Sequence, residues 1–68
     1  MTNTKVLRSE MILHDDTNKN LAESLGISEG RCSAKINNNA DAKFTDKEKM
    51  LIKERYQLSD DKFLEIFF

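Results

Sequence analysis

Three adjacent polar residues and a single cysteine carry the side chains best suited to catalysis or metal binding. His14, Asp15 and Asp16 form a polar break between two apolar segments, which indicates a surface turn without a pocket. A metal site needs several ligands at suitable spacing, and His14 has no second histidine and no cysteine at such a spacing. Cys32 is most simply a small buried hydrophobic residue rather than a reactive thiol. We therefore expect no enzyme activity, no metal and no cofactor.

A second set of residues, between positions 29 and 35, is suited to recognition instead of catalysis. Arg31 could donate two hydrogen bonds to a guanine, Glu29 could accept one from a cytosine, and Ala34 could touch a thymine methyl group. Gly30 costs a helix roughly 1 kcal/mol relative to alanine, so it either permits close approach of the backbone to DNA or is merely tolerated. The candidates for contact with DNA bases are Glu29, Gly30, Arg31, Ser33 and Ala34.

The segment 17–38 predicts the elements that would position this set: two short helices joined by a tight turn. Thr17 is suited to cap a first helix over 18–25, and Gly26 to end it in the left-handed conformation. Ser28 is suited to cap a second helix. The apolar positions that would face the core are Leu21, Ala22, Leu25, Ile27, Cys32 and Ile36. The pattern is a helix-turn-helix with its second helix presented to the outside.

The pattern T-x-x-x-L-A-x-x-L-G-I-S, followed by an apolar residue and S-x-x-I-N, resembles the helix-turn-helix of phage Cro and repressor (XRE-type) DNA-binding proteins. The residues that match in register are Thr17, Leu21, Ala22, Leu25, Gly26, Ile27, Ser28, Cys32, Ser33, Ile36 and Asn37. Three positions depart from the family: Asp16 replaces an apolar residue, Asn18 replaces a glutamine, and Cys32 replaces a larger aliphatic residue. The resemblance implies an all-α, lambda-repressor-like domain of five helices.

In a helix-turn-helix protein, polar residues around the two helices hold the phosphate backbone and set the register on DNA. The candidates for phosphate contact are Asn18, Lys19, Ser28, Lys35, Asn37, Asn38, Asn39 and Lys43. The alternative is that these are ordinary residues on the surface of a helical domain. A carboxylate such as Glu29 is repelled by phosphates unless it pairs with a base.

The rest of the chain predicts three further helices. Thr4 is suited to cap a helix that runs to about Leu13, with Val6, Leu7, Met11 and one of Ile12 and Leu13 facing the core. After a turn at 37–39 and a loop that Phe44 returns to the core, Thr45 and Glu48 form a capping box for a helix to about Gln57. Ser59 opens a last short helix. Part of its apolar end would complete the core, and the candidates for a dimer surface are Phe63, Ile66, Phe67 and Phe68.

Length and composition fit one small helical domain over residues 1–68, with the helix-turn-helix core at about 17–38 and C-terminal helices at 45–68. One cysteine permits no internal disulfide, which fits the cytoplasm. No apolar run is long enough for a membrane span. The net charge is −1, so a DNA-binding protein of this composition must gather its cations on one face.

The resemblance implies a sequence-specific transcriptional regulator, a Cro-like phage or prophage repressor that binds a double-stranded DNA operator as a weak homodimer. A second hypothesis is an antirepressor-type module that binds a phage repressor instead of DNA. The negative net charge, the short second helix of the motif and the apolar C-terminal segment favour this alternative. A helical domain without a role in DNA binding is a third.

Overall fold

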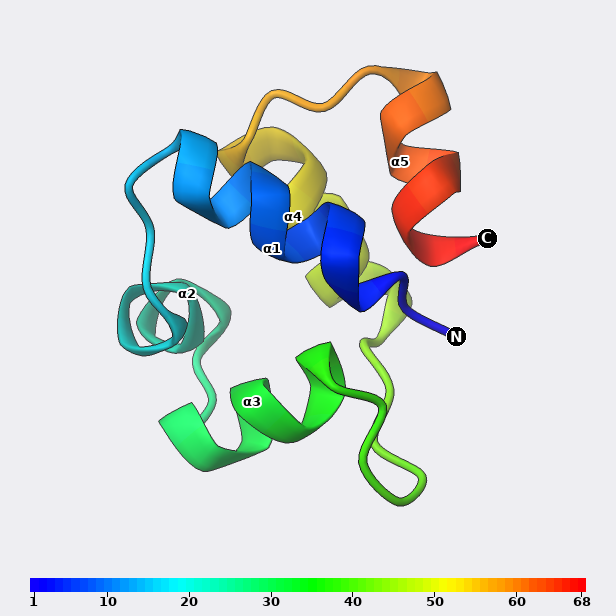
Figure 1. Cartoon of the computed structure of the whole chain (residues 1–68). Coiled ribbons are helices and arrows are strands. Elements are labelled where there is room, and N and C mark those ends of the chain that lie inside the picture. Colours follow the sequence, from blue (N-terminus) through cyan, green and yellow to red (C-terminus); the bar gives the residue numbers. More distant parts are fainter.

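Five α-helices and no strand make up the computed structural model, which describes residues 1–68. The helices are α1 (Thr4–Leu13), α2 (Asn18–Leu25), α3 (Glu29–Ile36), α4 (Asp46–Arg55) and α5 (Asp60–Phe67). In Figure 1, α1 lies in front of α4, with α5 on one side and the α2–α3 pair on the other. The predicted all-α class with five helices is confirmed.

Hydroxyl caps begin four of the helices at the residues that the sequence predicts. The side chains of Thr17, Ser28 and Ser59 each accept a hydrogen bond from the backbone N–H three residues later, at 3.1, 3.2 and 3.1 Å. Thr45 and Glu48 form the expected reciprocal capping box, which satisfies two backbone donors at the start of α4. Helix α4 ends at Arg55, two residues earlier than predicted.

Helix α1 begins differently from the prediction. Its cap is Asn3, whose side chain accepts from the N–H of Val6 at 3.3 Å, and not Thr4. The Thr4 hydroxyl instead donates to the carbonyl oxygen of Ile36, at the end of α3, at 2.6 Å. The first turn of α1 is therefore tied to the helix-turn-helix unit.

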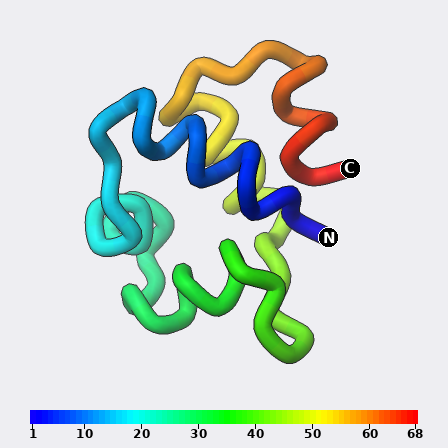
Figure 2. The backbone as a smooth tube through the Cα atoms, in the orientation of Figure 1, coloured from blue at the N-terminus to red at the C-terminus, as the bar shows by residue number.

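The turn between α2 and α3 depends on Gly26, which adopts φ = 73° and ends α2 in the left-handed region. Its N–H bonds the carbonyl of Glu23 at 3.2 Å, and the N–H of Ile27 bonds that of Ala22 at 3.0 Å. In Figure 2 the tube of α2 is seen nearly end-on while α3 runs across the view, so the two helices cross steeply. Residues 17–37 thus form the predicted arrangement of two helices and a tight turn.

Each helix contributes to one cluster of twelve buried apolar side chains. Its members are Leu7, Met11, Leu21, Ala22, Cys32, Ile36, Phe44, Ile52, Tyr56, Leu58, Ile66 and Phe67. Phe44 returns the loop to the core as predicted, with its ring edge-on to Phe67 at 5.9 Å between centroids. The expectation that Ile12 or Leu13 faces the core is wrong, because both side chains are largely exposed.

Two of the four residues predicted for a dimer surface belong to the core instead. Ile66 and Phe67 are buried in the core of the same chain, and the carbonyl oxygen of Ile66 accepts from the N–H of Asn3 at 2.7 Å. This bond brings the two ends of the chain together, as Figure 2 shows. Phe63 is partly buried, and Phe68 is 79% exposed. No helix has the length and apolar character needed to cross a bilayer.

Candidate nucleic-acid interface

The N-terminal half of α3, the recognition helix of the predicted motif, is the part of the helix-turn-helix that is open to a partner. Ser28, Glu29, Gly30 and Arg31 are all exposed. Neither Glu29 nor Arg31 belongs to any of the four ion pairs in the structure. Three of the five candidates for base contact therefore lie together, and two of these carry charged groups with no internal partner.

An open hollow of about 320 Å³ separates the exposed side of α3 from the loop that leads to α4. The residues that line it are Arg31, Ala34, Lys35, Asp41, Ala42, Lys43 and Thr45. Arg31 and Lys43, twelve positions apart in the sequence, thus face the same hollow. Asp41 adds a negative charge to the lining of the same hollow, so the electrostatic character of this surface is mixed.

Lys35 is buried, so the prediction that it contacts phosphate is wrong. Its Nζ donates to both carboxylate oxygens of Glu48, at 2.7 and 2.9 Å. The two side chains are only 9% and 10% exposed. Lys35 follows Cys32 by three positions and precedes Ile36, so it shares the buried side of the helix. Its ammonium group is bound within the protein and is not free for phosphate.

Glu48 is held in its charged form by this arrangement. Burial disfavours the carboxylate, but hydrogen bonds from Lys35 and from the Thr45 backbone outweigh it and lower the pKa of Glu48. The ion pair is therefore complete at neutral pH.

Two of the three asparagines after α3, Asn37 and Asn38, hold the chain together, although the sequence predicts that they contact phosphate. Asn38 accepts from the Thr2 N–H at 3.0 Å and donates to the Thr2 carbonyl at 2.8 Å. Asn37 accepts from Arg8 at 2.8 Å and donates to the Ser33 carbonyl at 2.9 Å. These two amides are already engaged, so they are poor candidates for direct phosphate contact. The remaining candidates keep accessible side chains: Asn18 is half-buried, and Lys19, Asn39 and Lys43 are exposed.

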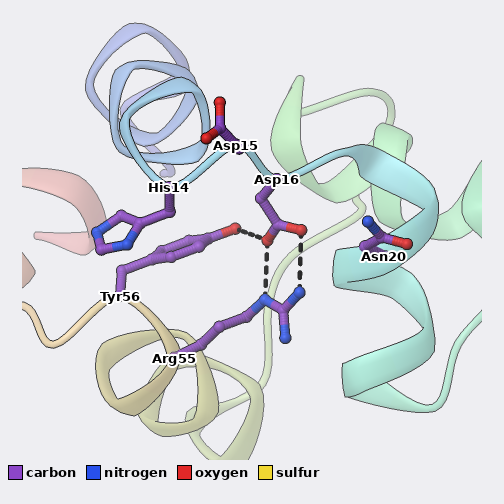
Figure 3. A pocket seen from close by; sticks show the side chains of 6 residues that line it. All are labelled: His14, Asp15, Asp16, Asn20, Arg55 and Tyr56. Atoms are coloured by element: carbon purple, nitrogen blue, oxygen red, sulfur yellow. Dashed lines mark hydrogen bonds and ion pairs between the residues drawn. The ribbon is translucent and has the colours of Figure 1, made fainter.

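A second polar cluster surrounds Asp16, which departs from the family pattern. The Asp16 carboxylate accepts from Arg55 through Nε at 2.8 Å and Nη2 at 2.9 Å, and also from the Tyr56 hydroxyl. Figure 3 shows these three bonds converging on the carboxylate. The Asp16 side chain is only 4% exposed, and that of Arg55 is 34% exposed. The carboxylate is therefore buried and fully hydrogen-bonded within the protein.

Asp16 lines a hollow together with His14 and Asp15. The prediction that these three residues form a surface turn without a pocket is therefore wrong. The hollow has a volume of about 310 Å³ and is open to solvent. The His14 ring stacks on Tyr56 with 5.1 Å between centroids. In Figure 3, His14 and Asn20 point away from the Asp16–Arg55 pair, so the polar groups do not converge on a substrate position. The cluster joins the α1–α2 turn to the end of α4.

Cys32 is a core residue, as predicted, because it is fully buried. Burial is the main cause that raises the pKa of its thiol to about 11, and the nearby carboxylates of Glu48 and Asp16 add to the effect. The thiol is therefore protonated at neutral pH and has little nucleophilic character.

These observations define an all-α domain of five helices, in which a helix-turn-helix unit exposes the first half of its second helix. Comparisons with protein-family models, with curated proteins and with solved structures gave no match.

Proposed function

We propose that this protein is a sequence-specific DNA-binding regulator that inserts the N-terminal half of α3 into the major groove. The observation that carries the proposal is the exposed, unpaired Arg31 at the start of the second helix of the motif. In this architecture the first residues of that helix meet base edges. Arg31 is the candidate for bidentate contact with a guanine, and Glu29 for contact with a cytosine.

The electrostatic contribution to this binding is small, since Lys35 is engaged by Glu48. The cations left on the candidate surface are Lys19, Arg31 and Lys43, all exposed. Each phosphate contact contributes roughly −0.9 to the slope of log K against log salt. Three such contacts give a slope of about −3 per protomer. Affinity therefore depends on the fit of α3 to its site more than on charge.

Binding to a palindromic operator requires two copies, with recognition helices one helical turn of DNA apart, roughly 34 Å. Ile66 and Phe67 belong to the core, so Phe68 and the partly buried Phe63 remain as candidate dimer residues. This small set supports a weak homodimer that assembles on DNA. Repression in the cytoplasm, by exclusion of polymerase from an overlapping promoter, is what the resemblance to Cro-like proteins implies.

A second candidate function is a module that binds another regulator, such as a phage repressor, in place of DNA. The specific observation in its favour is the mixed charge of the α3 surface, where Glu29 and Asp41 accompany Arg31 and Lys43. A surface of this kind suits a polar protein partner, because it neither repels nor strongly attracts a polyanion.

The proposal is tested by selection from a random library of DNA duplexes, followed by anisotropy titration with the enriched and a scrambled duplex at several salt concentrations. Arg31→Ala should abolish the preference for the enriched sequence. Arg31→Lys keeps the charge but loses the bidentate geometry, so it should also lose most of the preference. Lys5→Ala removes an exposed cation from α1 and is the matched control. Failure to enrich any sequence would refute DNA recognition and favour the protein partner.

A further inference from the structure

The second half of α3 is attached to the protein by polar contacts, whereas its first half has none beyond its cap. The contacts come from two directions. Lys35 binds Glu48 in the first turn of α4, and the Ile36 carbonyl accepts from the Thr4 hydroxyl at 2.6 Å. Just after the helix, Asn38 exchanges two hydrogen bonds with Thr2.

Glu48 joins two elements through one carboxylate. Its Oε1 accepts from Lys35 Nζ at 2.7 Å and from the Thr45 N–H at 2.9 Å. The Glu48 N–H in turn donates to the Thr45 hydroxyl at 3.1 Å. The carboxylate that starts α4 is therefore also the group that holds α3.

The connection between α3 and α4 is a loop over residues 37–45 without helix or strand. Such a loop does not by itself fix the orientation of the helices that it joins. Apolar packing of Cys32 and Ile36 brings α3 to the core, but apolar contacts are not directional. The hydrogen bonds of Ile36 and Asn38 are directional, but they tie the end of α3 to the N-terminal segment. The Lys35–Glu48 pair is directional, joins α3 to α4 and is nearly excluded from solvent, so it sets the orientation of α3 against α4.

We propose that Lys35 and Glu48 are positioning residues that fix the orientation of α3 against α4, so that Arg31 and Lys43 face a common hollow. The consequence for DNA rests on the proposed function: the pair determines discrimination between sequences without touching DNA. The orientation itself is a property of the free protein and is testable without DNA.

The informative variant is the double substitution Lys35→Met with Glu48→Gln. Glutamine at the third position of a helix maintains a capping box, and methionine replaces the aliphatic part of lysine. Removing both charges avoids an unpaired buried ion, so stability is largely kept. Glu54→Gln makes the same substitution at an exposed, unpaired position of α4 and is the matched control.

Two readouts are expected to change in the double variant while the midpoint of thermal unfolding stays close to that of the wild type. Amide hydrogen exchange should become roughly tenfold faster or more over residues 29–36, with α1 unchanged. The ratio of affinities for the enriched and scrambled duplexes should fall roughly tenfold. Glu54→Gln should change neither.

Wild-type exchange rates in α3 together with a wild-type affinity ratio would overturn the inference. If the wild type itself recognises no sequence, the proposed function fails, and the exchange measurement alone decides whether the pair positions α3. If the double variant does not fold, the inference is tested on the wild type by NMR. The ammonium protons of Lys35 should exchange with water slowly, and exchange as fast as that of the exposed Lys5 ammonium would refute the ion pair with Glu48.

Discussion

Replacing Asp16 by asparagine should remove a large share of the stability of this domain. The side chain keeps its shape, but it loses the charge that receives two hydrogen bonds from Arg55 and one from Tyr56. The amide that replaces one carboxylate oxygen is itself a donor, so it cannot accept from these groups. Asp16→Asn therefore tests whether the buried carboxylate stabilises the fold by joining the α1–α2 turn to the end of α4.

The magnitude follows from the exposure of the two partners. Loss of one member of a buried ion pair costs about 3–5 kcal/mol, which is an upper bound here because Arg55 is 34% exposed and can turn towards water. Hydrogen bonds to a charged group contribute about 1.5–3 kcal/mol each. We expect a loss of about 2–3 kcal/mol in the free energy of unfolding. A domain of this length has a total stability of only about 5 kcal/mol.

Arg55→Met should cost more than Asp16→Asn at neutral pH. It leaves a carboxylate that is 4% exposed without its cation, whereas Asp16→Asn leaves a guanidinium that can be hydrated. Tyr56→Phe removes one hydrogen bond to the charged carboxylate and should cost about 1.5 kcal/mol, the lower end of that range, because Asp16 keeps both bonds from Arg55. Urea titrations followed by circular dichroism measure all three, and a slope near 1 kcal/mol per molar turns the Asp16→Asn loss into a midpoint shift of roughly 2–3 M.

The same variants predict a pH dependence. Hydrogen bonds from Arg55 are the main cause that lowers the pKa of Asp16 below its ordinary value of 3.8. A lowered pKa in the folded state contributes stability above 3.8 that is lost as pH falls through the folded value. The stability of the wild type should therefore fall in acid, and that of Asp16→Asn should fall less. Glu48, whose pKa is also lowered, keeps part of the acid response in the variant. Two results at neutral pH would together refute a stabilising role of the Asp16 carboxylate. Asp16→Asn would lower the free energy of unfolding by less than about 0.5 kcal/mol, and Arg55→Met would lower it by no more than Asp16→Asn does.

Two further predictions concern the glycines and the cysteine. Gly26→Ala places a Cβ at φ = 73° with no atom within 4 Å, so it should lower the free energy of unfolding by about 1 kcal/mol through conformational strain alone. Gly30→Ala lies within α3 with equally open space and should raise the free energy of unfolding by about 1 kcal/mol. Equal effects of the two substitutions in thermal melts would contradict this assignment. Cys32 should react with an aromatic disulfide only through unfolding, because its thiol is buried and its pKa is raised to about 11. Labelling of native protein as fast as of urea-unfolded protein would show that the thiol is accessible.

The local features of this fold were predictable because their causes lie within a few residues. Thr17, Ser28, Thr45 and Ser59 each begin a helix through a bond to a residue three positions later, which a sequence pattern displays directly. Gly26 likewise marks the turn by its own conformational freedom. Helix order, the tight turn and most of the core follow from these signals and from apolar spacing.

The polar contacts between distant segments were not predictable in the same way. Lys35 and Glu48 are 13 positions apart, and Asp16 and Arg55 are 39 apart. Local spacing gives no measure of which charged residues meet across a fold. Lys35 was therefore assigned to the surface on its charge, although its spacing from Cys32 and Ile36 placed it on the buried side. Ile66 and Phe67 were assigned in part to an interface for the related reason that an apolar run does not tell which of its faces is covered.

A signal for both pairs was nevertheless present in the sequence. Asp16 stands where the resembled family has an apolar residue, and Lys35 has the spacing of a core position on α3. A charged side chain at a position that the fold buries requires an opposite charge nearby. Without one, the free energy lost by removing the ion from water far exceeds what neutral hydrogen bonds restore. Each such departure therefore indicates a partner elsewhere in the chain.

Internal ion pairs also bear on function, since each one removes a cation from the set that can bind a polyanion. Lys35, Lys53, Arg55 and Lys62 all bind carboxylates of their own chain. The positive charge that remains near α3 is small and is accompanied by Glu29 and Asp41. A DNA-binding protein with so little electrostatic attraction has to obtain its affinity from a precisely oriented recognition helix. If the surface instead binds a protein, the same orientation matters, but the salt dependence of binding should be far weaker than a slope of about −3.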